Sequence, residues 1–163
     1  MTSSARSAST VHLILSQLNK NKILNKIKQI SEEIIMCKET KFYICEKCGN
    51  IIGKIHDSGV GVVCCGQKMT YLEPGVVEAS REKHIPVAKK EGDTVKVVVG
   101  SVIHPMTEEH SIQWIYLQTD KGGQRKCLQP GEAPEVTFAL AGEQPIAVYA
   151  YCNLHGLWKA DIE

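Results

Sequence analysis

The segment Tyr149-Ala-Tyr-Cys-Asn-Leu-His-Gly-Leu-Trp158, near the C-terminus, decides how the rest of the chain is interpreted. Two strand-like apolar runs flank a tight loop, and this loop carries Cys152 and His155 three positions apart. A thiolate and an imidazole at that spacing can bind one metal ion. Because no further ligand lies nearby in the sequence, the remaining ligands must come from other parts of the fold.

The region around this segment, from residue 79 to residue 163, is typical of an all-β domain. Apolar and β-branched runs separated by turn signals such as Lys121-Gly-Gly123 and Gln129-Pro-Gly131 predict strands at 94–99, 112–118, 136–140, 146–151 and 157–162. Short strands at this spacing predict an antiparallel sandwich or barrel.

Three more histidines occupy loops of this β region. His84 precedes the first predicted strand, and His104 and His110 flank a loop between two strands. Since a β-sandwich gathers its loops at its ends, we expect all three to converge on Cys152 and His155. A structural zinc site is closed by four ligands, whereas five ligands with one open position indicate a redox-active iron. One thiolate on Fe(II) leaves positive charge at the site, which favours a small anionic ligand.

A second group of ligands precedes the β region. Of seven cysteines, four occur as Cys45-x-x-Cys48 and the adjacent pair Cys64-Cys65. The odd total and the strain of a disulfide between neighbours favour metal binding in a reducing compartment over a disulfide framework. Residues 40–76 are too few to be stabilised by burial alone, so a four-thiolate site would replace a core. Iron and zinc both suit such a site.

The domain organisation follows from these patterns. Pro74-Gly75 interrupts regular structure, which divides the chain into an N-terminal extension (1–39), a four-cysteine domain (40–76) and a β domain (77–163). Cys127 lies in a strand-like run and is predicted to have a structural role.

The N-terminal segment 1–36 has three interpretations. Its apolar residues recur with a roughly helical period, which predicts an appended surface helix. Its scarcity of acidic residues, with serines and lysines, also fits an organelle presequence. Alternatively, Met36 is the real initiator.

Composition excludes two classes of function. The net charge is +1, with both signs spread along the 163 residues, so we expect no nucleic-acid partner. No run of about 18 apolar residues exists, so we expect no membrane span.

The motifs together resemble the desulfoferrodoxin, or two-iron superoxide reductase, family over residues 41–163. The resemblance is carried by Cys45-Glu-Lys-Cys48-Gly-Asn, Cys64-Cys65-Gly-Gln, Glu82-Lys83-His84, His104-Pro-Met-Thr-Glu-Glu-His110 and Cys152-Asn-Leu-His155-Gly-Leu-Trp. It implies a mainly β fold, with a small rubredoxin-like (desulforedoxin) metal domain followed by an antiparallel immunoglobulin-like β-sandwich.

The resemblance also implies roles for individual residues. A tetrathiolate iron would be bound by Cys45, Cys48, Cys64 and Cys65. The catalytic iron would have four imidazole ligands and one axial thiolate, from His84, His104, His110, His155 and Cys152. The Glu82 carboxylate would occupy the vacant position of the oxidised iron, and Lys83 would attract superoxide and help deliver protons.

The implied activity is the one-electron reduction of superoxide to hydrogen peroxide by a cytoplasmic homodimer, with an external electron donor such as rubredoxin. Two other functions stay open. One is a rubredoxin-like electron-transfer protein without superoxide turnover, which would leave the open coordination position unexplained. The other is a zinc-stabilised binding module, which would leave the four histidines unexplained.

Overall fold

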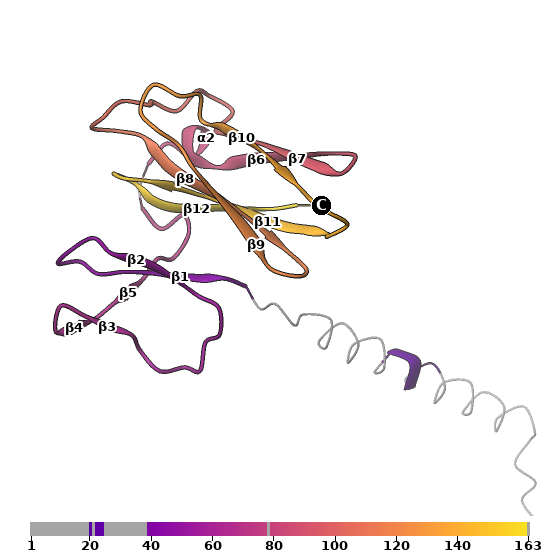
Figure 1. The fold of residues 1–163 in the computed structure, drawn as a ribbon, viewed down its shortest axis with the longest axis horizontal. Helices are drawn as coiled ribbons and strands as arrows, with labels where there is room; N and C mark the ends of the chain where they lie inside the picture. The colour runs from indigo at the N-terminus through magenta and orange to yellow at the C-terminus, as the bar shows by residue number, and fades with distance from the viewer. Residues whose placement is uncertain (1–19, 21, 25–38, 78, 163) are drawn as a thin grey trace, which may run out of the picture. The chain divides into compact units, whose positions relative to one another are not determined.

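The computed structural model describes residues 20, 22–24, 39–77 and 79–162 (Figure 1). From Cys37 onward the chain forms one compact unit. The predicted N-terminal helix falls almost entirely outside the described residues; residues 20 and 22–24 are helical. In the described part of the chain, no helix is both long enough and apolar enough to cross a membrane.

Residues 79–162 form the predicted antiparallel β-sandwich. Its first sheet has the strand order β10-β7-β6, and its second has the order β12-β11-β8-β9 (Figure 1). The strands are β6 (Pro86–Glu91), β7 (Thr94–Val99), β8 (Ile112–Thr119), β9 (Gly123–Cys127), β10 (Glu135–Ala139), β11 (Pro145–Cys152) and β12 (Gly156–Asp161), with one helical turn, α2 (Arg81–His84).

Side-chain alternation along β11 divides the second sheet into two faces. Val148, Ala150 and Cys152 point into the main core between the sheets, where all three are fully buried. Tyr149 and Tyr151 belong instead to a second cluster on the opposite face. Cys152 is therefore the last inward-facing residue of its strand, at the end of the sandwich.

The second face is covered by the four-cysteine region. This region contains the strands β1 (Lys41–Ile44), β2 (Ile51–Lys54), β3 (Val63–Cys64), β4 (Gln67–Lys68) and β5 (Thr70–Tyr71), arranged as a β2-β1-β5 sheet and a β3-β4 hairpin. Phe42 of β1 packs against Trp114, with ring centroids 5.1 Å apart, and edge-on to Tyr116 and Tyr149. Because these contacts cross from residues 40–76 to the sandwich, the boundary at residues 76 and 77 stays a prediction.

Four local expectations need correction. The strands β6 and β9 are not among the predicted runs, because the two lysines and the glutamate of β6 and the polar residues of β9 hide the alternation. His84 lies on the helical turn α2 rather than in an irregular loop. Cys127 does lie in a strand, but its side chain is exposed and not part of the core.

Candidate metal centres

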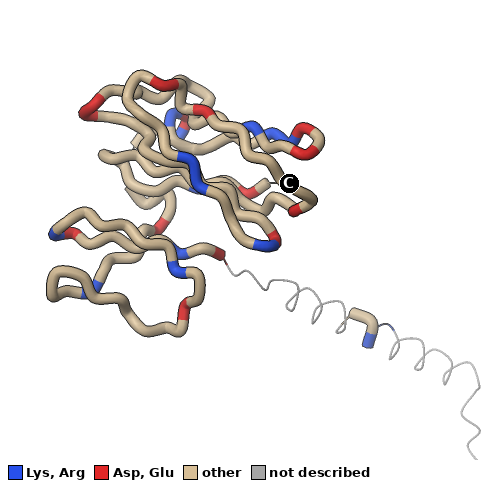
Figure 2. Tube along the Cα trace, in the orientation of Figure 1, with Lys and Arg blue, Asp and Glu red and all other residues tan. Residues whose placement is uncertain are grey.

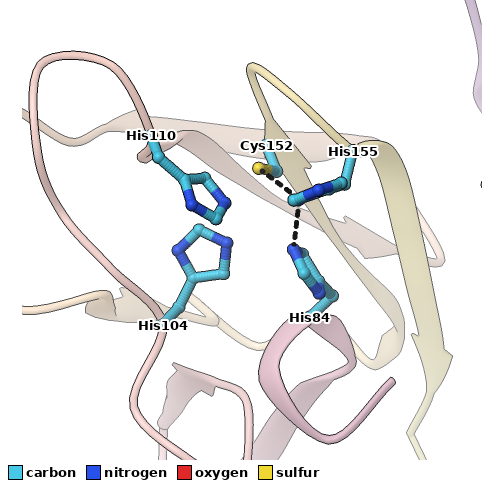
Figure 3. Close-up of side chains that lie close together, drawn as sticks. All are labelled: His84, His104, His110, Cys152 and His155. Carbon is cyan, nitrogen blue, oxygen red and sulfur yellow. Dashed lines mark hydrogen bonds between the residues drawn. The ribbon is translucent and has the colours of Figure 1, made fainter. Parts of the chain in front are cut away.

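Five predicted ligands meet at one end of the sandwich (Figure 3). One potential ligand atom from each lies within 4.8 Å of every other. The residues come from α2 (His84), the loop between β7 and β8 (His104 and His110), the end of β11 (Cys152) and the turn before β12 (His155).

The turn α2 is fixed by the loop that follows β7. The backbone N–H of Val102 donates to the Glu82 carbonyl (3.1 Å), and the N–H of Gly100 donates to the Ile85 carbonyl (3.0 Å). Gly100 has φ +81°, and a Cβ there would lie 2.6 Å from the Lys83 carbonyl oxygen. Only glycine allows the loop to approach the turn this closely.

The turn between β11 and β12 is fixed by Asn153. Its side-chain oxygen accepts the Ser111 N–H (3.0 Å), and its side-chain nitrogen donates to the Glu109 carbonyl (2.9 Å). These two bonds tie the turn that carries His155 to the loop that carries His110.

Backbone carbonyls select the tautomers of two histidines. The Nδ1 atom of His84 is 2.7 Å from the Ser80 carbonyl oxygen, and that of His104 is 2.6 Å from the Pro105 carbonyl oxygen. A carbonyl only accepts hydrogen bonds, so each Nδ1 carries the proton and each Nε2 has a free electron pair. This arrangement orients imidazoles for metal binding in many proteins.

Two of the ring nitrogens of this group have no hydrogen-bond partner. The Nε2 atoms of His104 and His110 are buried and have no hydrogen-bond partner. The Nε2 of His84 lies 3.0 Å from the Nδ1 of His155, which is 3.6 Å from the Cys152 sulfur. Buried polar atoms without partners are costly, and a shared cation would satisfy them. The residues present therefore fit a transition metal bound by four nitrogens and one sulfur.

Electrostatics favour the metal-binding form of the imidazoles. Burial lowers the pKa of His84 and His110, and it lowers that of His104 to about 4. These rings are therefore neutral near pH 7, as metal ligation requires. Burial raises the pKa of the Cys152 thiol, while hydrogen bonds from the N–H groups of Leu154 and His155 act in the opposite direction. A bound cation would remove the thiol proton.

Glu82 and Lys83 lie beside the five-residue group but are not part of it. The Glu82 side chain is exposed, and its carboxylate accepts a hydrogen bond from the Ser80 hydroxyl. This bond is the main reason that the pKa of Glu82 is lowered. Lys83 is half-buried on the same turn.

The four other predicted ligands form a second group. The sulfurs of Cys45, Cys48, Cys64 and Cys65 all lie within 4.8 Å of one another. Hydrogen bonds from backbone N–H groups lower the pKa of Cys45 to about 7, whereas the neighbouring sulfurs raise that of Cys65 to about 12. The thiols thus lose their protons unequally, and a bound cation would favour four thiolates. This sulfur set suits zinc and iron alike.

Several supporting residues were not predicted from the sequence. Ser80, Gly100 and Asn153 act through backbone or side-chain hydrogen bonds; Ser80 and Gly100 lie outside the quoted motifs, and Asn153 lies inside one that assigned it no role. A glycine at the end of a predicted strand was the one available signal for Gly100. Trp158, the last residue of the C-terminal motif, stacks on the His84 ring, with centroids 4.9 Å apart.

Comparisons with known proteins agree with this arrangement. A family model described as desulfoferrodoxin matches residues 76–161. The chain is 44% identical over 126 residues to a desulfoferrodoxin of Nitratidesulfovibrio vulgaris, covering 77% of this chain and 99% of that protein. It is 37% identical over 100 residues to a superoxide reductase of Pyrococcus horikoshii, covering 50% of this chain and 87% of that protein. The solved superoxide reductase of Treponema pallidum is 42% identical, with a TM-score of 0.64 over 75% of this chain and 97% of that one.

Proposed function

Because the chain belongs to the desulfoferrodoxin family, we propose that it is a superoxide reductase, which adds one electron and two protons to superoxide and releases hydrogen peroxide. The observation that carries the proposal is the group of four imidazoles and one thiol with two buried, unpartnered Nε2 atoms. Proteins named superoxide reductase are similar to this chain in sequence and in structure.

The proposed cofactor of this group is iron, held by the nitrogens of His84, His104, His110 and His155 and by the sulfur of Cys152. Iron bound there would supply the electron and a Lewis-acidic position for a small anion. The N–H groups of Leu154 and His155 point at the sulfur and stabilise its negative charge. The thiolate in turn raises the electron density of the site, which favours giving an electron to the substrate.

Lys83 is proposed to attract the substrate. Positive and negative residues are distributed over the described part of the chain (Figure 2), so the electrostatic field of the whole protein is weak. A single lysine beside the site therefore has a proportionally large effect on an approaching anion. The Glu82 carboxylate is proposed to act as an internal anion that occupies the site when no substrate is present. Trp158, stacked on His84, closes one wall of the site and excludes water.

The proposal also covers the four-cysteine site, the electron donor, the oligomeric state and the cellular compartment. The four cysteines would hold a tetrathiolate iron, with zinc as the alternative metal. An external one-electron donor such as rubredoxin would return the site to its reduced form, and the protein would act as a homodimer. The six described cysteines are all free, which supports a reducing compartment, proposed to be the cytoplasm.

The test measures products. The iron-loaded protein is reduced with ascorbate and mixed with superoxide under anaerobic conditions, and peroxide and oxygen are quantified. A reductase forms as much peroxide as it consumes superoxide and evolves no oxygen. Oxygen evolution would indicate dismutation, and no reaction of the iron-loaded protein would favour the rubredoxin-like electron-transfer alternative.

Two substitutions localise the activity. Cys152→Ser should abolish peroxide formation while the four-cysteine centre keeps its metal. Cys127→Ser removes an exposed thiol of β9, outside both ligand groups, and should leave the rate unchanged. Full activity of Cys152→Ser would contradict the assigned role of the thiolate.

A further inference from the structure

Ser80 makes three hydrogen bonds that no motif in the sequence predicts. Its backbone carbonyl accepts hydrogen bonds from the Nδ1 of His84 (2.7 Å) and from the N–H of Lys83 (3.1 Å). Its hydroxyl donates to the carboxylate of Glu82. One residue therefore orients a ligand through its main chain and an acidic side chain through its hydroxyl.

The acidic side chain is held away from the five-residue group. Residues two positions apart on a helix point about 200° apart, so Glu82 and His84 lie on opposite sides of α2. The Glu82 side chain lines a surface hollow of about 210 Å³ together with Arg81, Ile85, Val87 and Ser101. None of the five grouped residues lines this hollow.

Two hydrogen bonds oppose a backbone movement of Glu82 that would bring the carboxylate inward. Its carbonyl accepts hydrogen bonds from the Val102 N–H (3.1 Å) and the Ser101 hydroxyl (3.3 Å). A carboxylate anchored this way can reach a metal among the five residues only by rotating its own side chain. This rotation breaks the hydrogen bond to Ser80.

We propose that Ser80 is a positioning residue whose hydroxyl retains the Glu82 carboxylate on the outer side of α2 and so limits its competition with anions for the metal site. The proposal rests on the proposed function, because it concerns an anion-binding metal held by the five residues. The site then stays open to an exogenous anion for as long as the Ser80–Glu82 hydrogen bond persists.

The size of the effect follows from one hydrogen bond. A hydrogen bond to a charged group at a partly exposed position favours the retained conformation about fivefold. Loss of the hydroxyl should therefore weaken the binding of an exogenous anion by up to about fivefold, because the freed carboxylate competes more often; the full factor applies where the carboxylate already occupies most sites. The His84 contact is unaffected, since it uses the Ser80 main chain.

The experiment compares Ser80→Ala, Ser80→Thr, Glu82→Ala and the double variant Ser80→Ala/Glu82→Ala. Azide is titrated into the oxidised, iron-loaded proteins, and its dissociation constant is read from the visible absorption spectrum. Ser80→Ala should weaken azide by up to about fivefold, whereas Ser80→Thr keeps a hydroxyl and should bind azide like the wild type. The double variant should match Glu82→Ala, since without the carboxylate the hydroxyl has nothing to retain.

A second readout requires no metal. In the metal-free protein, Ser80→Ala should shift the NMR resonance of the Glu82 carboxyl carbon and leave the imidazole resonances of His84 in place. An unchanged Glu82 resonance, or equal azide affinities of wild type and Ser80→Ala, would overturn the proposal. If the iron-loaded wild-type protein bound no azide, the proposed function and the competition would both fail, and the NMR shift would still decide whether the contact exists.

Discussion

Gly100→Ala tests how the ligand on α2 is positioned. Gly100 has φ +81°, a conformation that costs an L-residue about 1–2 kcal/mol. The added Cβ would also lie 2.5 Å from the Val102 carbonyl oxygen and 2.6 Å from that of Lys83. Both atoms belong to the backbone, so no side-chain rotation relieves the overlap, and overpacking of this kind costs about 1–3 kcal/mol more.

A matched control separates the two contributions. Gly142 has φ +80°, and a Cβ there would meet no atom within 4 Å. Gly142→Ala should therefore lose only the conformational part, about 1–2 kcal/mol, whereas Gly100→Ala should lose about 2–5 kcal/mol. For a chain of this size we expect Tm to fall by about 3–6 °C for Gly142→Ala and by about 6–15 °C for Gly100→Ala.

The metal provides the second readout. Displacing the Lys83 carbonyl moves the next residue, His84, so Gly100→Ala should weaken iron binding at the five-residue site by about tenfold. Gly142→Ala should bind iron like the wild type. Calorimetry and a metal titration measure the two effects. Equal Tm and equal iron affinity for the two variants would refute the reasoning, because the backbone contact would then position nothing.

Three further predictions concern charge and metal content. Lys83→Ala should slow the bimolecular reaction with superoxide about two- to fivefold at low ionic strength and much less at high salt, as measured by stopped-flow mixing; equal rates at low salt would exclude the attraction. Asp57 accepts hydrogen bonds from Lys54 (2.8 Å) and Lys41 (3.0 Å), which lower its pKa. Because its folded-state pKa lies below the unfolded value, it stabilises the protein above about pH 4. This stabilisation is lost as the pH falls further, so acid unfolding of Asp57→Asn should show a smaller dependence on pH in that range. Removal of metal from the four cysteines by a chelator should abolish hydrogen-exchange protection in β1 and β2 while β8 and β11 stay protected; unchanged protection of β1 would show that the metal is not structural.

Much of the architecture could be predicted because β-sandwich strands carry a local signal. The predicted run 94–99 coincides with β7, and the predicted runs 112–118 and 146–151 fall within β8 and β11. The buried side chains of β7 are all valines, and those of β8 and β11 include Ile112, Trp114, Val148 and Tyr149, residue types that favour strands. In β6, by contrast, only Pro86 is buried. An edge strand with one buried residue has no alternation to detect.

The candidate ligands, which the structure brings together, could be recognised in the sequence for a different reason. Metal ligands belong to few residue types, so His104, His110 and the Cys152–His155 pair stand out even without a fold. The geometry that orients them is invisible in the sequence. The hydrogen-bond partner of the His84 ring is the main-chain carbonyl of Ser80. Because every residue has a main-chain carbonyl, the side chain at position 80 gives no signal of this contact. The role of Gly100 likewise depends on the path of a neighbouring backbone.

Neighbouring side chains of β11 point to opposite faces of the sheet, so this strand contacts both the five-residue group and the four-cysteine region. Cys152 points into the core between the sheets and is one of the five grouped residues, whereas Tyr151 points to the opposite face of the sheet. The Tyr151 ring stacks on Trp114, with centroids 5.3 Å apart and ring planes 7° apart. Trp114 in turn contacts Phe42, on the strand that leads to Cys45. A strand cannot shift one residue without shifting the next, so packing that fixes Tyr151 also fixes the sulfur of Cys152. The packing of the four-cysteine region on this face therefore also helps to fix the position of Cys152 in the five-residue group.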